Sequence, residues 1–492
     1  MGRVSSETSA GLSRASREAD DATRGSAIKL AAEISSRLLL LATTLLLARG
    51  LILEDYGAFG RLAAYALLFA ELAELGLQLT ATRALVAGTL SLRALVRARV
   101  ALFGAFAIVV LGAAAWLAAS PAAGRLQPLV LTLLVFYFAL SGWGEFLGVA
   151  LRCRGARAHE AIVLLVLRAG GLLLVAMALA AGGGLTTVAA GLAISPLPAL
   201  GVGAWMLLRR PPAAPAPNAS VATVLLSSAP LAVYGGLLLL STRVEFIIFS
   251  MVRDDGSTAL LFAAVQVLWF LAMMPTAIAA GAMPALTREA LKGGAGVRQR
   301  TSATLALLGA PAGVGLVLVA PGVLGLLFGS PYEAAARSLR VLALAVVPVF
   351  MNALPVWSLI AAGRSSWLPV LTGTRVAVAF VLALLLIPSL GAVGAAAGLV
   401  LAEGVLLLLG VRACAAAGFP VPVARPVLLA LLATVPMALA VSGVRENLFL
   451  AVAVGVLTYA ATLAGAWRLF PALAARMLGG SVVSAPDEEG RA

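Results

Sequence analysis

Turn-forming residues divide the chain into a series of apolar stretches, each about as long as a helix that crosses a lipid bilayer. A hydrocarbon core of about 30 Å needs about 20 apolar residues in helical conformation. A backbone inside lipid must satisfy its own hydrogen bonds, so each stretch is expected to be a helix. The predicted fold class is therefore all-α, a polytopic membrane protein with about 14 transmembrane helices. The predicted spans are 27–48, 58–79, 100–119, 129–149, 161–181, 186–208, 223–249, 259–282, 302–328, 341–361, 367–387, 391–411, 427–443 and 448–469.

The composition leaves no realistic alternative to a membrane. The chain is 62% hydrophobic and only 11% charged, whereas a soluble domain is about 45–50% apolar and about 25% charged. Its charges are too few to cover a water-facing surface. Two cysteines, Cys153 and Cys414, and a single histidine, His159, are also too few for a disulfide framework or a zinc site. We therefore expect no metal and no cofactor.

The net charge of +14 has two readings, a nucleic-acid partner or the excess of basic residues in cytoplasmic loops. The distribution of the basic residues decides between them. Most of the 35 Lys and Arg residues fall in the two tails and in alternate loops between the predicted spans. This alternation predicts an inner-membrane protein whose termini are both cytoplasmic. It also argues against nucleic acid, because the positive charge is not gathered in one patch.

The spans group into two halves. Each half holds six spans and starts on the cytoplasmic side, so we expect two six-helix lobes related by pseudo-two-fold symmetry, followed by a C-terminal helix pair. Polar tails predicted to be disordered precede and follow the spans. The predicted parts are a tail 1–25, an N-terminal lobe 26–208, a linker 209–222, a C-terminal lobe 223–413, helices 13–14 at 425–470, and a tail 471–492.

Charged side chains inside spans are costly and should have a partner or border a watery cavity. Glu33 and Arg37 are four residues apart and therefore share a helix face. Arg375 and Glu403 lie at matching depths on consecutive spans, so we expect them to be in contact. For both pairs two roles stay open: a structural salt bridge, or a cavity lining that meets substrate.

Arg243 and Glu245 are two residues apart and point to different helix faces, so neither satisfies the other. Arg243 is thus the first candidate for a cation that faces a ligand. Gln266 and Asn352 are further candidates for polar contacts with substrate, although such residues also hold helices together. Arg168 is predicted to line a cavity or join a polar network near the cytoplasmic ends of its neighbours.

A sequence resemblance is found around the first loop. Residues 47–60 read LARGLILEDYGAFG and resemble the end of helix 1 in bacterial polysaccharide flippases. The run Glu74-Leu75-Gly76-Leu77, followed by Thr82-Arg83, is similar to an Asp-Leu-Gly-Leu run of that family that ends in a basic residue. The chain departs from the pattern with Ile52-Leu53 in place of Gly-Pro and with Glu at position 74.

The resemblance implies a two-lobe transporter whose central cavity binds a lipid-linked saccharide, with the diphosphate near cavity arginines and the lipid tail in the bilayer. Membrane lipid, a proton or sodium gradient, a polysaccharide polymerase and glycosyltransferases are the partners that it implies. Three alternatives stay open: a cation-coupled multidrug extruder, a flippase for peptidoglycan precursors, and a membrane glycosyltransferase or polymerase. The short loops between spans disfavour an enzyme, which would need a domain outside the membrane.

Overall fold

The structure is a computed structural model that describes residues 31–120, 123–210 and 217–469. The predicted tails 1–25 and 471–492 and part of the predicted linker 209–222 lie outside the described residues. The described chain is helical and forms two compact units, Met1–Gly236 and Leu237–Ala492. The boundary between the units falls inside one helix, α10.

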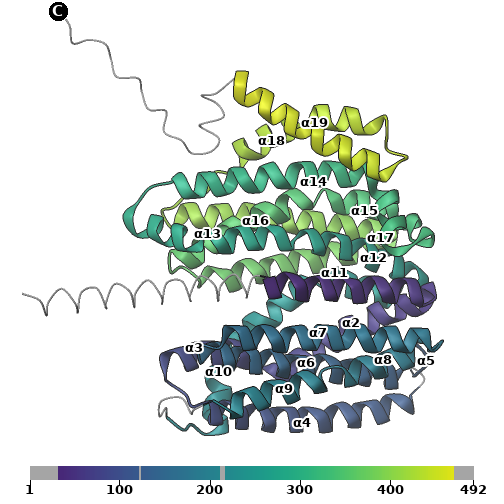
Figure 1. Cartoon of the computed structure of the whole chain (residues 1–492), viewed down its shortest axis with the longest axis vertical. Coiled ribbons are helices and arrows are strands. Elements are labelled where there is room, and N and C mark those ends of the chain that lie inside the picture. Colours follow the sequence, from purple (N-terminus) through teal and green to yellow (C-terminus); the bar gives the residue numbers. More distant parts are fainter. Residues whose placement is uncertain (1–30, 121–122, 211–216, 470–492) are drawn as a thin grey trace, which may run out of the picture. The chain divides into compact units, whose positions relative to one another are not determined.

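The first unit consists of helices that lie side by side and run roughly across the view of Figure 1. Most carry too few charges to lie in water and are long enough to cross a membrane. In chain order they are Ala31–Gly50, α2 (Leu53–Glu74), α3 (Leu77–Ala87), α4 (Leu92–Ala118), α5 (Ala123–Leu126), α6 (Pro128–Cys153), α7 (Arg157–Ala180), α8 (Leu185–Ile194), α9 (Leu197–Leu208) and the first part of α10 (Val221–Ser241).

Two spans of this unit are broken in the middle. α2 ends at Leu75 and Gly76, which both have left-handed backbone conformations, with φ of 41° and 68°. The chain then continues as α3 in the same membrane span. α8 gives way to α9 at Ser195 and Pro196, because proline has no N–H to donate to the helix. Both breaks leave backbone groups outside the regular helical ladder at membrane depth.

The second unit repeats this style of construction with a further helix pair at its end (Figure 1). Its helices are α11 (Val244–Val252), α12 (Asp255–Leu271), α13 (Met273–Lys292), α14 (Gly296–Phe328), η1 (Ser330–Ala335), α15 (Ala336–Ala343), α16 (Val346–Ala361), α17 (Trp367–Ala416), α18 (Ala424–Ser442) and α19 (Leu448–Leu469).

The predicted number of spans agrees with the described helices. Within the described residues, 12 helices are long and apolar enough to cross a membrane, or up to 13 if the bent pair Ser330–Ala343 and Val346–Ala361 forms one span. α17 is 50 residues long because two helices meet without a gap at Gly391, whose φ of 57° and ψ of −130° are not helical. Counting its two arms separately gives about 14 spans, which is the predicted number.

Several helices extend beyond the predicted spans. α4 begins at Leu92 rather than at residue 100, with Ser91 as its N-cap accepting a hydrogen bond from the N–H of Ala94. Arg93, Arg97 and Arg99, predicted as loop residues or loop flanks, therefore lie within the first turns of this helix. The prediction missed these turns because arginines were read as the limit of the apolar stretch.

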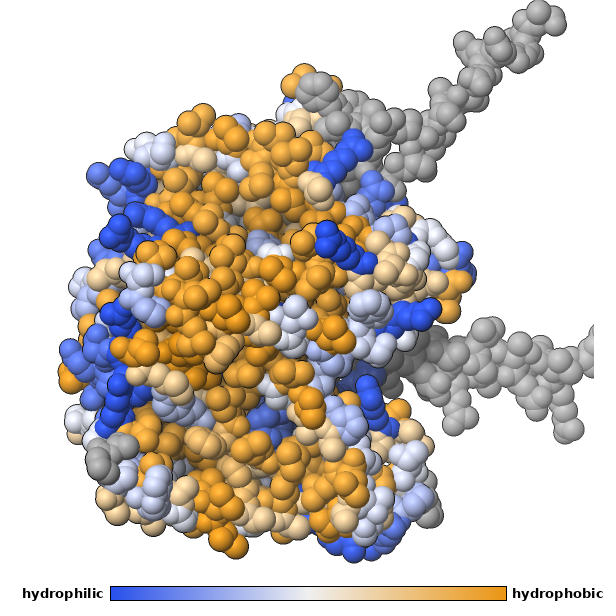
Figure 2. Space-filling model, turned by 180° about the vertical axis from the view of Figure 1, so that it is seen from behind, coloured by the Kyte–Doolittle hydropathy of each residue, from blue (hydrophilic) through white to orange (hydrophobic). Residues whose placement is uncertain are grey.

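The surface confirms a multi-pass membrane protein. In Figure 2 apolar side chains cover most of the visible face, and hydrophilic ones gather towards its margins. Exposed large apolar residues recur along single helices, as with Val100, Ile108, Leu111 and Trp116 of α4. An apolar surface of this extent would aggregate in water, whereas lipid is its natural solvent.

Candidate functional site

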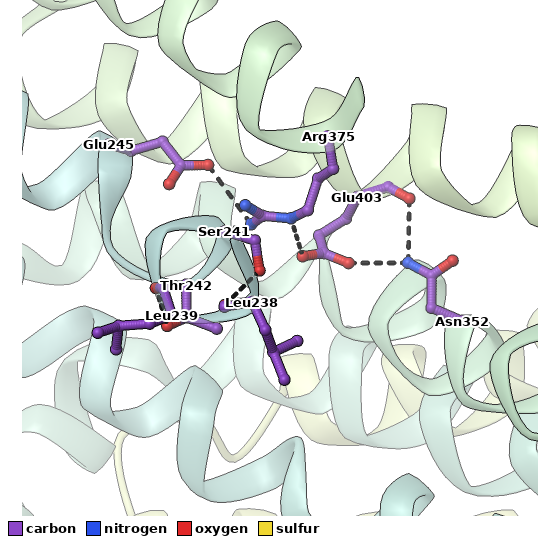
Figure 3. A network of polar contacts seen from close by, with 8 residues as sticks. All are labelled: Leu238, Leu239, Ser241, Thr242, Glu245, Asn352, Arg375 and Glu403. Carbon is purple, nitrogen blue, oxygen red and sulfur yellow. Dashed lines mark hydrogen bonds and ion pairs between the residues drawn. The ribbon is translucent and has the colours of Figure 1, made fainter. Parts of the chain in front are cut away.

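Four polar side chains from three helices meet inside the second unit. We call Glu245, Asn352, Arg375 and Glu403 the buried cluster (Figure 3). Each is at most 7% exposed. Glu245 comes from α11, Asn352 from α16, and Arg375 and Glu403 from the two arms of α17.

The arginine stands between the two carboxylates. Arg375 Nε donates to Glu403 Oε1 at 2.9 Å, and Arg375 Nη2 donates to Glu245 Oε1 at 3.5 Å. Asn352 Nδ2 donates to Glu403 Oε2 at 2.8 Å and to the backbone oxygen of Glu403 at 3.1 Å. The sequence-predicted contact between Arg375 and Glu403 is therefore present, and Glu245 and Asn352 join it.

Breaks in two helices place these side chains. The bend of α17 at Gly391 folds its second arm back, so that Glu403 reaches Arg375. The chain turns between α10 and α11 at Thr242 and Arg243, one turn before Glu245. There the hydroxyls of Ser241 and Thr242 donate to the carbonyl oxygens of Leu238 and Leu239 at 2.7 Å and 2.8 Å (Figure 3). The hydroxyl of Ser241 gives the Leu238 carbonyl a partner at the end of α10, and the Leu239 carbonyl also accepts a hydrogen bond from the N–H of Thr242.

The charges of the buried cluster do not cancel. Two carboxylates share one guanidinium, so the fully ionised cluster carries one excess negative charge. An uncompensated charge in a low-dielectric interior is costly. Arg375 Nη1, itself buried, has no hydrogen-bond partner among the described residues. The cluster thus has both a spare negative charge and a spare donor, and it is suited to gaining a proton or an additional polar contact.

Arg243 is two residues before Glu245 in the chain and does not join the buried cluster. It precedes α11 as its N-cap residue and is half-buried. Its Nε is buried without a hydrogen-bond partner among the described residues, and no ion pair to a described residue is formed. A small cavity of about 10 Å³ next to it is lined by Thr242 and Glu245 among others, which is about the space of one water molecule.

The other predicted site residues do not join this cluster. Gln266 is half-buried in α12, and among the described residues it makes no polar side-chain contact. Arg37 Nη2 pairs with Glu33 Oε1 at 2.9 Å, and both side chains are more than 40% exposed. Arg168 Nη2 pairs with Glu145 Oε1 at 2.8 Å. These two pairs belong to the first unit.

A second polar group in the first unit was not predicted. Arg99 of α4 is buried and pairs with Glu74 of α2, while its guanidinium lies 5.2 Å and 4.9 Å from the ring centres of Trp143 and Phe146. This ion pair holds the Glu74 carboxylate against α4. The two aromatic residues of α6 could have indicated that Arg99 is buried against them, because arginine stacks well on aromatic rings.

No metal centre accompanies these groups. Among the described residues, no three or more His, Cys, Asp or Glu side chains are placed to hold a metal ion. The available chemistry is that of charged hydrogen bonds, and not of a nucleophile with its base. In membrane proteins, buried charged side chains of this kind mark ligand, ion or proton pathways.

Comparisons with known proteins identify similar folds but no matching sequence family. No family model matches the chain, and no curated protein matches it. A solved structure of the lipid II flippase MurJ in an inward closed conformation has a TM-score of 0.72 at 13% identity, covering 90% of this chain and 99% of the flippase.

Multidrug transporters are similar over less of the chain. An outward-facing MATE family transporter of the MOP superfamily has a TM-score of 0.53 at 17% identity and covers 79% of this chain. A MOP superfamily transporter from Pyrococcus furiosus gives 0.54 at 16% identity and covers 80%. All of these neighbours are transporters. The chain has the fold of the membrane transporters and flippases of the MOP superfamily.

Proposed function

We propose that this chain is a flippase that moves a polyprenyl-diphosphate-linked saccharide across a bacterial inner membrane by alternating access. Both termini would lie in the cytoplasm. Glycosyltransferases that build the saccharide on its lipid would supply the substrate, and a polymerase or ligase on the far side would consume it. The protein would act as a transporter and not as an enzyme.

The observation that carries this proposal is the extent of the structural match. The likeness to the lipid II flippase covers 90% of this chain with a TM-score of 0.72, whereas the likeness to a multidrug MATE transporter covers 79% with 0.53. A fold at this low identity does not carry substrate with it. The local resemblance of residues 47–60 to polysaccharide flippases supports the same branch independently.

Within this proposal Arg243 is the group that meets the diphosphate. A guanidinium is a planar fork that stays charged and matches phosphate oxygens. Arg243 has no ion pair to a described residue and keeps a buried Nε without a partner, so a ligand would satisfy a donor that the protein leaves open. Arg37 and Asn352 are secondary candidates, and Gln266 stays a candidate from the sequence alone.

Arg375 receives a different role. Its guanidinium is engaged by Glu403 at 2.9 Å and is only 2% exposed, so substrate could reach it only after the helices part. We assign Arg375, Glu245 and Glu403 to coupling. A proton or cation that neutralises the excess carboxylate would change how tightly α11 is held to the two arms of α17. Glu33 and Arg168 are further candidates for coupling or cavity lining.

The test is a flipping assay with purified protein in proteoliposomes. Its substrate is a fluorescent polyprenyl-diphosphate disaccharide, and the readout is quenching of the label from outside. Arg243→Ala should lower the flipping rate at least about tenfold, which corresponds to about 1.4 kcal/mol, at the lower end for a charged hydrogen bond. Arg425→Ala is the control, because Arg425 is exposed at the start of α18.

Two outcomes would count against this assignment. If Arg243→Ala flips at the wild-type rate while it inserts at the wild-type level, Arg243 does not contact the substrate. If the wild-type protein itself leaves the labelled lipid in place, the proposed substrate class is wrong. A native lipid II with its peptide, used as second substrate, separates a peptidoglycan-precursor flippase from an oligosaccharide flippase.

A further inference from the structure

The first unit contains an apolar groove that the proposed transport does not use. It lies between α2, α4 and α6 and has a volume of about 190 Å³. Leu72 contributes from α2, Val110, Ala114 and Leu117 from α4, and Leu131 from α6. All three helices are membrane-spanning, so the groove opens to lipid and not to water.

The lining offers no polar group to a ligand. Thr132 is the single lining residue with a polar side chain, and its Oγ1 donates to the backbone oxygen of Pro128 at 2.7 Å. A ligand in this groove would therefore be held by dispersion and by the exclusion of apolar surface, without a directed hydrogen bond. A saturated or monounsaturated hydrocarbon chain meets that description.

The length of the groove matches one leaflet. Along α4 its lining runs from Phe106, near the middle of the helix, to Leu117 at its end. At the helical rise this is about 16 Å, or roughly half of a hydrocarbon core of about 30 Å. An acyl chain of an ordinary phospholipid extends over that distance. A long polyprenyl chain would run well beyond it.

A positive charge stands at the open end. α5 links the end of α4 to the start of α6, so it lies next to the groove residues Leu117 and Pro128. It carries Arg125, whose side chain is exposed. The backbone oxygen of Arg125 accepts a hydrogen bond from Nη2 of the buried Arg61 at 2.7 Å. This bond holds the backbone of α5 against α2, so Arg125 lies at the end of the groove where α4 and α6 are linked.

We propose that this groove is a binding site for one anionic phospholipid. One acyl chain fills the space between α2, α4 and α6, and the phosphate lies near Arg125. The site is separate from the buried cluster, which belongs to the other unit. It does not depend on the proposed substrate, because a phospholipid would bind there in any transporter with this unit.

The test uses two neighbouring alanines of α4. Ala114 lines the groove, whereas Ala115 is exposed and lies outside its lining. The full-length protein is delipidated in detergent, incubated with palmitoyl-oleoyl phosphatidylglycerol and examined by native mass spectrometry. We expect the wild type and Ala115→Trp to retain one tightly bound phosphatidylglycerol, and Ala114→Trp to lose it. Arg125→Gln should retain a smaller fraction.

A second measurement works on the wild type alone and does not depend on how a variant folds. Phosphatidylglycerol with a diazirine on its acyl chain is bound, the protein is washed in detergent, and the sample is irradiated. Adducts should map to Val110 and Leu131 in preference to Ile108 and Leu111, which are exposed on α4 outside the groove.

Three results would overturn the proposal. Equal retention by Ala114→Trp and Ala115→Trp would show that the bound lipid lies elsewhere. Adducts spread evenly over α4 would show an ordinary lipid annulus. Displacement of the bound phosphatidylglycerol by a polyprenyl phosphate added in competition would identify the groove as a site for the substrate tail. None of these results bears on whether the protein flips a lipid-linked saccharide.

Discussion

Arg375 is the residue on which the interior of the second unit depends most. It faces two carboxylates, with Glu403 Oε1 at 2.9 Å and Glu245 Oε1 at 3.5 Å. Removing one partner of a buried ion pair leaves an uncompensated charge and is far costlier than the net worth of the pair. The two glutamates are held differently, because Glu403 also accepts a hydrogen bond from Asn352, whereas the ion pair of Glu245 with Arg375 is the longer of the two.

We therefore expect Arg375→Met to destabilise the protein by about 3–5 kcal/mol, and Glu403→Gln to cost less. The double variant should be less destabilised than the sum of the two, with a coupling of about 0.5–3 kcal/mol. Unfolding of the purified protein in detergent measures all three. Additive costs would contradict the pairing. A simple exchange of Arg375 and Glu403 is a poor test, because it would place a new carboxylate beside Glu245.

Asp254 offers a pH-dependent contact outside the spans. Its carboxylate caps α12 by accepting hydrogen bonds from the N–H and the hydroxyl of Ser257, both at 2.8 Å. These bonds lower the pKa of Asp254 below its ordinary value. The cap therefore stabilises the fold above the unfolded pKa of about 3.9, and this contribution is lost as the pH falls through the lower folded pKa.

The expected result is a stability difference between wild type and Asp254→Asn that is present at pH 7 and shrinks below about pH 4. Asparagine caps helices about as well as aspartate but has no charge to lose. Thermal unfolding at a series of pH values gives the comparison. A difference that is constant across the whole range would contradict a role for the ionised carboxylate.

At the scale of the element, bends and breaks in the helices position the polar side chains of the candidate site. The bend at Gly391 brings Arg375 and Glu403 together. The break at Leu75 and Gly76 lies in the run that resembles polysaccharide flippases. The predicted spans 367–387 and 391–411 place the bend between them, whereas the predicted span 58–79 runs through Leu75 and Gly76 without a break. The apolar pattern misses the break at Gly76 because a residue in left-handed conformation does not change hydropathy.

Gly391 can be tested against a matched glycine in the same helix. Its φ of 57° with ψ of −130° is a conformation that essentially only glycine adopts, so Gly391→Ala should cost about 1–3 kcal/mol. Gly404 is in regular helix with no atom near the position of an added Cβ. Gly404→Ala should instead stabilise by up to about 1 kcal/mol. Equal effects of the two variants on unfolding would contradict the bend.

Alanine substitutions at Gly76 and Gly88 distinguish the effect of backbone strain on stability from the effect of steric crowding. Their φ values are 68° and 67°, so an alanine is equally strained at both. A Cβ at Gly76 would lie 2.5 Å from the backbone nitrogen of Ala232 in α10, whereas at Gly88 nothing lies within 4 Å. We expect Gly88→Ala to cost about 1–2 kcal/mol and Gly76→Ala clearly more. Equal losses of stability in the two variants would show that α10 moves away from the added Cβ at no cost in free energy.

At the scale of the whole molecule, the sequence predicts more of the fold than of the site. The number of spans follows from the length and hydropathy of the apolar stretches, and the contact between Arg375 and Glu403 follows from their equal depth. The contact of Glu245 with Arg375 could not be predicted, because the two residues are 130 positions apart in the sequence. Depth in the membrane does not show which helices are neighbours. Arg99 was predicted to lie outside the spans and is buried, and so is Arg61, which falls within the predicted span 58–79.

The proposed substrate class can be tested by comparing the transport of two substrates. The same proteoliposomes are assayed for flipping of a polyprenyl-diphosphate saccharide and for uptake of a cationic drug, ethidium, under an imposed proton gradient. We expect the saccharide lipid to cross the membrane and ethidium to remain where it was added. Transport of ethidium with the saccharide lipid left in its original leaflet would contradict this expectation and identify a drug extruder.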